Sequence, residues 1–144
     1  MIPFKDELDK LSLSQSEYAL FGSAQLAVKG IRPSKDLDII VTSELWESLT
    51  SKYLQYIKHH PIRLHLGNVE IFKDWVNLSD KIDEMIANAE IIDGIPFVRM
   101  EYVLEWKRFM GRPKDIADIS LIEKHFSRQR RSNAYSKRQS SNST

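Results

Sequence analysis

Apolar residues recur along the 144-residue chain in two periods, and each period predicts a different kind of element. Spacings of three and four residues predict helices over residues 4–13, 24–29, 43–54, 79–89, 100–110 and 114–125. Short apolar runs predict strands over residues 18–21, 36–41, 62–66, 69–72, 91–92 and 95–98. Gly67-Asn68 and Asp93-Gly94 separate neighbouring strands as two-residue hairpin turns do. The pattern therefore predicts an α/β (α+β) fold in which helices flank a mixed, mostly antiparallel sheet.

The last 18 residues differ in composition from the rest of the chain. Residues 127–144 contain five Lys and Arg residues and no acid, while the whole chain carries a net charge of +1, which leaves −4 on residues 1–126. The segment offers little apolar surface to offset the entropy of ordering it. We predict one folded domain over residues 1–126 and a disordered basic tail over 127–144.

The composition excludes several classes of protein. The absence of Cys excludes disulfide frameworks and cysteine nucleophiles. Charges at the N-terminus argue against a signal peptide, and no stretch approaches the roughly 18 apolar residues of a membrane span. The four His residues lack the spacing of a zinc site, although His65 is expected near Glu70. We therefore expect a cytoplasmic protein that does not enter a membrane.

The candidate chemistry lies in a Gly-Ser turn and three carboxylates. Gly22 and Ser23 follow an apolar run, Asp36 and Asp38 open a second one, and Glu70 lies between apolar neighbours in a later one. Side chains alternate across a strand, so we expect Asp36 and Asp38 on one face, with Glu70 completing a cluster from a neighbouring strand. Carboxylate oxygens suit Mg²⁺ or Mn²⁺.

The turn adds a place for phosphates. A glycine lets the backbone approach a ligand, and N–H groups at the start of a helix attract anions. Gly22 and Ser23 are therefore expected to bind an NTP such as ATP, although Ser23 also suits a helix N-cap. Arg32 either contacts phosphate or acceptor, or braces the loop before Asp36. Metal ions on the phosphates favour in-line displacement, and the predicted reaction is nucleotidyl transfer.

The arrangement of Phe21-Gly22-Ser23, a helix and then Asp36-Leu37-Asp38 in an apolar strand resembles the polymerase-β-like nucleotidyltransferase superfamily. In that family the two aspartates bind metal, and a third carboxylate on a following strand completes the triad. The resemblance implies a palm-like sheet and gives catalytic and metal-binding roles to Asp36, Asp38 and Glu70.

A second segment, residues 103–119, is similar to small prokaryotic members of the superfamily, which include AbiEii-like toxins and antibiotic-modifying enzymes. Its pattern is a helix with a lysine, then Gly-Arg-x-Lys-Asp, then a helix with another Asp. The resemblance implies nucleotide-binding roles for Lys107 and Lys114. It also implies that a set of four residues lines the cleft or ties two helices together: Arg112, Lys114, Asp115 and Asp118. The alternative is that these four residues form an ion-pair network without a functional role.

These observations predict a metal-dependent nucleotidyltransferase that moves an NMP from an NTP to an acceptor hydroxyl. RNA or tRNA, a protein and a small molecule stay open as acceptors. The resemblance implies a toxin–antitoxin setting with an antitoxin protein as partner. The alternative is a non-catalytic module on the same fold that binds nucleotide, RNA or protein. The basic tail is either a solvated end or a source of affinity for RNA.

Overall fold

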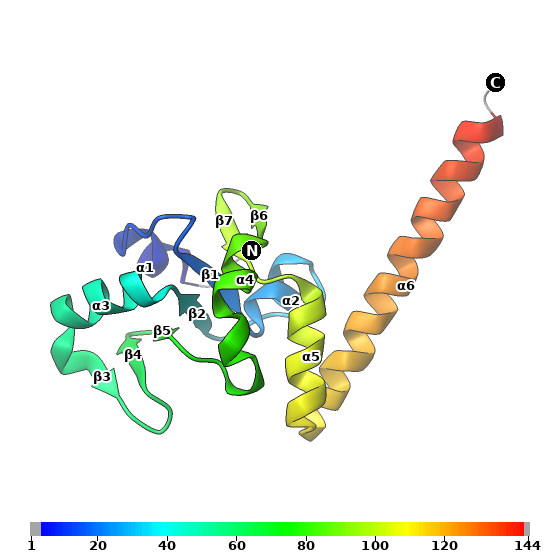
Figure 1. Ribbon diagram of the computed structural model, residues 1–144. Helices are drawn as coiled ribbons and strands as arrows, with labels where there is room; N and C mark the ends of the chain where they lie inside the picture. The colour runs from blue at the N-terminus through cyan, green and yellow to red at the C-terminus, as the bar shows by residue number, and fades with distance from the viewer. Residues whose placement is uncertain (1–3, 143–144) are drawn as a thin grey trace. The chain divides into compact units, whose positions relative to one another are not determined.

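The computed structural model describes the backbone of residues 4–142 and the side chains of residues 4–134 (Figure 1). The chain divides into two compact units between Trp106 and Lys107, whereas the composition places a boundary after residue 126. Each unit is described by itself. Within residues 4–142, no helix is both long enough and apolar enough to cross a membrane.

A mixed sheet dominates the first unit, and within the described residues it has seven strands. From edge to edge these are β3 (Ile57–Lys58), β4 (Arg63–Leu66), β5 (Val69–Phe72), β2 (Leu37–Val41), β1 (Tyr18–Phe21), β7 (Ile95–Phe97) and β6 (Glu90–Ile92). The β2–β5 and β1–β7 pairs are parallel, and the other neighbouring strands are antiparallel. The predicted fold class is confirmed. The very short β3 was not predicted, because two residues carry no readable period.

Helices form where the apolar spacing predicts them, with shifted ends. They are α1 (Lys5–Lys10), α2 (Ala24–Val28), α3 (Ser43–Lys52), α4 (Ile82–Ala87), α5 (Met100–Met110) and α6 (Pro113–Asn142), with 3-10 turns η1 (Leu54–Tyr56) and η2 (Val76–Lys81). The side chain of Thr42 caps α3 by accepting from the Leu45 amide. Ser79, predicted as a cap, lies inside η2 and accepts from the Trp75 amide instead.

One face of the sheet carries the main hydrophobic core. Leu37, Ile39 and Val41 of β2 point into it, as strand alternation requires, and Leu8 of α1 and Trp46 of α3 pack on the same cluster. These side chains are almost completely buried. The strand that carries Asp38 is thereby fixed from one side, and its even-numbered residues face the opposite side.

An aromatic cluster covers part of the opposite face. Phe21 of β1 stacks on Trp75 with ring centroids 4.3 Å apart, and Phe72 of β5 and Trp106 of α5 meet Trp75 edge-on. Helix α4 packs on β1 and β2. This cluster buries the strand positions next to the predicted carboxylates, so the carboxylates lie at the border of an apolar layer.

Helix α1 also holds the turn between β4 and β5. The Glu7 carboxylate accepts hydrogen bonds from the backbone amide of Asn68, at 3.0 Å, and from its side-chain amide, at 2.9 Å. The Asn68 carbonyl in turn accepts from the Leu37 amide at the start of β2. One turn is therefore connected to both the N-terminal helix and the central strand.

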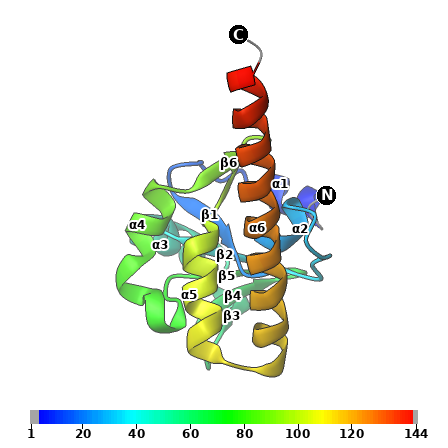
Figure 2. The ribbon, with the colours of Figure 1, turned by 90° about the vertical axis from the view of Figure 1, so that its right-hand side faces the viewer.

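The second unit consists of the end of α5 and the long helix α6, joined by a turn at Gly111, which has a φ of +60°. Figure 2 shows α6 as one continuous helix. It extends through residues 127–142, where the composition predicts disorder. That prediction considered only burial. The segment contains no Pro or Gly, and its Arg, Gln, Lys and Ala residues have favourable helix propensity.

Candidate functional site

Asp38 lies at the centre of the sheet. It is the second residue of β2, the middle strand in the sheet order, and its register partners are Phe21 on β1 and Glu70 on β5. The buried Leu37 and Ile39 on either side of Asp38 point to the main core, so its own side chain points to the other face. Asp38 is only partly buried.

Glu70 lies beside Asp38 on that same face. Residues in register on parallel strands point to the same side of a sheet, and the strands are about 4.8 Å apart. The Glu70 side chain is 26% exposed. The prediction that Glu70 approaches the aspartates from a neighbouring strand therefore agrees with the strand register for Asp38.

Gly22 forms the turn that closes over the Asp38 carboxylate. Its φ of +73° lies in the left-handed region, and a Cβ added to it would stand 3.1 Å from Asp38 Oδ2. A side chain at this position would crowd the carboxylate and strain the backbone. Glycine is therefore required here for two reasons, and the turn brings main chain against an acidic side chain.

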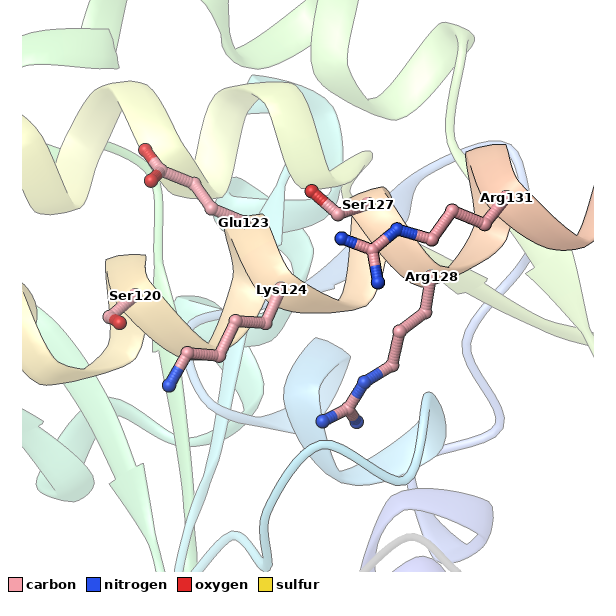
Figure 3. Close-up of a pocket in the computed structure, with 6 residues that line it drawn as sticks. All are labelled: Ser120, Glu123, Lys124, Ser127, Arg128 and Arg131. Carbon is pink, nitrogen blue, oxygen red and sulfur yellow. The ribbon is translucent and has the colours of Figure 1, made fainter.

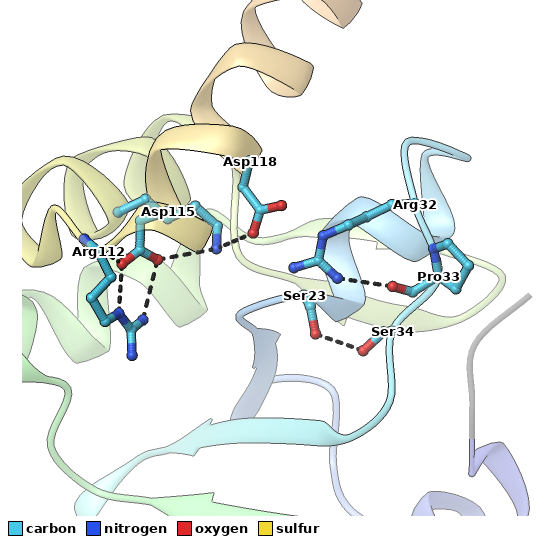
Figure 4. Close-up of polar contacts among 8 residues, drawn as sticks. Ser23, Arg32, Pro33, Ser34, Arg112, Asp115 and Asp118 are labelled. Carbon is cyan, nitrogen blue, oxygen red and sulfur yellow. Dashed lines mark hydrogen bonds and ion pairs between the residues drawn. The ribbon is translucent and has the colours of Figure 1, made fainter.

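Ser23 connects this turn to the loop that carries Asp36. Its hydroxyl lies 2.7 Å from the Ser34 hydroxyl (Figure 4). Ser34 donates to the Asp36 carbonyl oxygen over 2.9 Å. Ser23 occupies the N-cap position of the five-residue α2 but makes no side-chain capping hydrogen bond. The Ser23 hydroxyl thus connects the Gly-Ser turn to the loop before β2. Ser23 stands at the N-cap position, as predicted, but its side chain does not cap the helix.

Asp36 lies just outside the strand that was predicted to contain it. It is exposed and directly precedes β2, which begins at Leu37, so strand alternation does not fix the direction of its side chain. Among residues 4–134, no group of three or more His, Asp or Glu side chains is close enough to hold a metal ion as it stands. The register brings together Asp38 and Glu70, and hydrogen bonds tie the backbone of Asp36 to Ser23 through Ser34.

Two nitrogen-bearing side chains from β4 reach Glu70. The Arg63 Nε atom and the His65 Nδ1 atom each lie 2.8 Å from Glu70 Oε1. Burial raises the pKa of Glu70, but hydrogen bonds and charge from Arg63 and His65 outweigh it, so the pKa lies below its ordinary value. Glu70 is therefore ionised at neutral pH, and one of its oxygens is already engaged.

Arg32 braces its own loop. Its guanidinium donates to the Pro33 carbonyl oxygen over 2.9 Å (Figure 4). It also lines a surface hollow of about 390 Å³ together with Ala27, Gly30, Ile31 and Pro33. Of the two predicted roles for Arg32, the structure describes the bracing contact.

Lys107 belongs to a buried ion-pair network of the second unit. Its ammonium lies 2.9 Å from Asp118 Oδ2 and 3.7 Å from Asp115 Oδ1, and its side chain is 4% exposed. Asp115 also receives the Arg112 guanidinium through both oxygens, at 2.6 and 3.1 Å, and the Arg112 amide (Figure 4). This geometry agrees with the prediction that Arg112, Asp115 and Asp118 tie two helices together, and it engages Lys107, which was predicted to bind nucleotide, in the same network. Lys114 is exposed on α6.

Two polar partners of the site were missed in the sequence. Arg63 has no special spacing of its own, but it lies two residues before His65 on one strand, so both side chains share a face. Ser34 lies in a loop, where alternation gives no guidance. A search for basic residues across the hairpin from Glu70 would have found Arg63, and nothing in the pattern points to Ser34.

No family model, curated protein or solved structure matches the chain.

Proposed function

We propose that the first unit is a metal-dependent nucleotidyltransferase that moves an NMP from an NTP to an acceptor hydroxyl. The observation that carries the proposal is the position of Asp38, with Glu70 in register on one side and the Gly22 turn on the other. Three features that are widely separated in the sequence meet there. The resemblance of the Gly-Ser and Asp-x-Asp segments to the polymerase-β-like superfamily supports the same function.

The donor set fits a hard divalent cation. Asp38 and Glu70 offer carboxylate oxygens on neighbouring strands, and both side chains are partly accessible. Mg²⁺ prefers one or two protein carboxylates and takes its other ligands from water and phosphates. Asp38 and Glu70, with Asp36 from the position directly before β2, would hold Mg²⁺ or Mn²⁺. When bound, the metal would supply positive charge to offset that of the triphosphate.

The lowered pKa of Glu70 favours metal binding over proton transfer as the role of this carboxylate. An efficient general base has a pKa near the working pH, whereas a metal ligand must be ionised throughout. Arg63 and His65 hold the pKa of Glu70 below its ordinary value. Glu70 is therefore better suited to binding charge than to accepting a proton from the acceptor.

The turn residues have a separate task in this proposal. Gly22 lets the backbone of the turn approach the Asp38 carboxylate. Binding of a phosphate oxygen by Ser23 would replace the hydrogen bond between its hydroxyl and that of Ser34. In the reaction the acceptor oxygen forms a bond to the α-phosphorus, and the bond from that phosphorus to pyrophosphate breaks. The acceptor proton passes to water.

The test is transfer of label from α-labelled NTPs, with Mg²⁺ or Mn²⁺, into RNA, protein or the enzyme itself. We expect Asp38→Asn to abolish transfer, because it removes a charged ligand and keeps the shape of the side chain. Asp83→Asn is the matched control, since Asp83 is an exposed carboxylate on α4. Full transfer by Asp38→Asn would contradict the proposal.

A non-catalytic nucleotide-binding module is the second candidate, and the engagement of Glu70 Oε1 by Arg63 and His65 favours it. Thermal unfolding separates the candidates further, because a ligand that binds only the folded state raises the unfolding temperature. An enzyme and a nucleotide-binding module both gain stability from NTP with Mg²⁺, and only the enzyme transfers label. An antitoxin partner and the choice of NTP stay predictions.

A further inference from the structure

Helix α6 carries a surface of concentrated positive charge. Lys124, Arg128 and Arg131, which we call the basic face, are all exposed. Their spacings of four and three residues place them on one side of the helix, one turn apart. With Ser120, Glu123 and Ser127 they line a hollow of about 450 Å³ (Figure 3).

The one acid of this hollow is directed elsewhere. The Glu123 carboxylate accepts a hydrogen bond from the Arg108 guanidinium over 3.1 Å. Figure 3 shows the Glu123 side chain directed away from those of Lys124 and Arg128. After Glu123 the sequence contains no further Asp or Glu up to its last residue. The basic face therefore lies in a part of the sequence without acids, in which Lys137 and Arg138 follow.

The chemistry of the face identifies the partner. A helix that binds a membrane surface needs a stripe of large apolar residues opposite its charges, and the centre of a protein interface is rich in aromatic side chains. Between Lys124 and Ala134 the large apolar residues are limited to Phe126, which is partly buried. Charged and hydroxyl side chains without apolar surface are instead suited to phosphate oxygens.

We propose that the basic face of α6 binds the phosphate backbone of an RNA strand. Its three cations follow one another at about 4.5 to 6 Å along the helix axis, so that each can meet a different phosphate. The Ser120 and Ser127 hydroxyls add neutral donors beside them. This proposal goes beyond the nucleotidyl-transfer proposal, because binding by α6 needs none of the carboxylates of the first unit.

The test measures binding of a fluorescent single-stranded RNA to the full chain by anisotropy over a range of salt concentrations. We expect the triple variant Lys124→Gln/Arg128→Gln/Arg131→Gln to bind weakly. The slope of log K against log salt should become shallower by about 2, at roughly 0.7 per lost phosphate contact. The control variant Lys10→Gln/Lys52→Gln/Lys58→Gln removes the same charge from exposed positions of the first unit and should keep the full slope.

Two more variants sharpen the result. Arg128→Lys/Arg131→Lys keeps the charge and should retain most of the affinity, which would relate the loss in the triple variant to its charge. Asp38→Asn should bind RNA like the unmodified chain, so failure of this proposal and failure of nucleotidyl transfer are distinguishable. Equal losses in the triple variant and its control, or tighter binding of DNA than of RNA of the same sequence, would overturn the proposal.

Discussion

The two units each contain a cluster of charged side chains, and the clusters differ in exposure. Glu70 in the first unit is 26% exposed and lies on a sheet, whereas Asp115 in the second has no exposed side-chain surface and Lys107 has 4%. Buried charges require partners that remain in place, while partly exposed ones can exchange a partner for a ligand. The difference suggests a structural role for the Lys107 network and a ligand-binding role for the carboxylates of the sheet.

The largest effect is expected from Lys107→Ala. It would leave the buried carboxylates of Asp115 and Asp118 without this cation, and breaking a buried pair in this way costs about 3–5 kcal/mol. Arg108→Ala removes an exposed partner of Glu123 and should cost about 0–1 kcal/mol. Urea denaturation measures both. If Lys107→Ala kept its stability but lost NTP binding, Lys107 would be a nucleotide ligand and the comparison would fail.

Acid should destabilise the second unit through Asp115. Burial raises the pKa of this carboxyl, but the hydrogen bonds and charge of Arg112, with the charge of Lys107, outweigh burial and lower the pKa. A lowered pKa in the folded state contributes stability above the ordinary value, near pH 4, and this stability is lost as the pH falls toward the folded pKa. We expect Asp115→Asn to lower the free energy of unfolding by about 1.5–3 kcal/mol at neutral pH. We also expect the free energy of unfolding of this variant to depend less on pH in the acid range. The same pH dependence in the variant and the unmodified chain would exclude Asp115 as its source.

Gly22→Ala should separate strain from function in the first unit. A residue with a side chain in the left-handed region costs about 1–2 kcal/mol, and this applies equally to Gly30, with a φ of +70°. A Cβ at Gly30 meets nothing within 4 Å, whereas one at Gly22 meets Asp38 Oδ2. Gly30→Ala should show this backbone cost alone, and Gly22→Ala should add the cost of crowding Asp38. Only Gly22→Ala should lose transfer, by about a hundredfold, as for a displaced catalytic group. Equal activity of the two variants would argue against a role for the turn.

The smallest effect is expected from Ser23→Ala. It removes one hydrogen bond to Ser34 and should cost about 0.5–1.5 kcal/mol. Ser14→Ala, which removes an exposed contact with Ser16, is the control. Because Ser34 also holds the Asp36 carbonyl, Ser23→Ala should weaken NTP-dependent thermal stabilisation while Ser14→Ala does not. The same thermal stabilisation in both variants would remove Ser23 from the proposed site.

Features that depend on the pattern of neighbouring residues could be predicted from the sequence. Alternation in β2 and β5 predicts the fold class and brings Glu70 toward Asp38, because apolar neighbours leave only one face for each carboxylate. Partners that depend on tertiary contact were not predicted, among them Arg63 at Glu70 and Ser34 at Ser23. The length of α6 was also underestimated, since helix propensity along residues 127–142 was not weighed against the lack of burial.

The contact between Glu7 and Asn68 has a practical consequence for handling the protein. It fastens the hairpin that bears Glu70, through a turn that is also bonded to the first residue of β2. A fusion tag or deletion that disturbs α1 would therefore loosen a carboxylate that lies sixty-three positions later in the chain. Affinity tags for activity measurements should keep residues 4–10 intact, and a loss of activity after trimming this end should first be tested as a loss of anchoring.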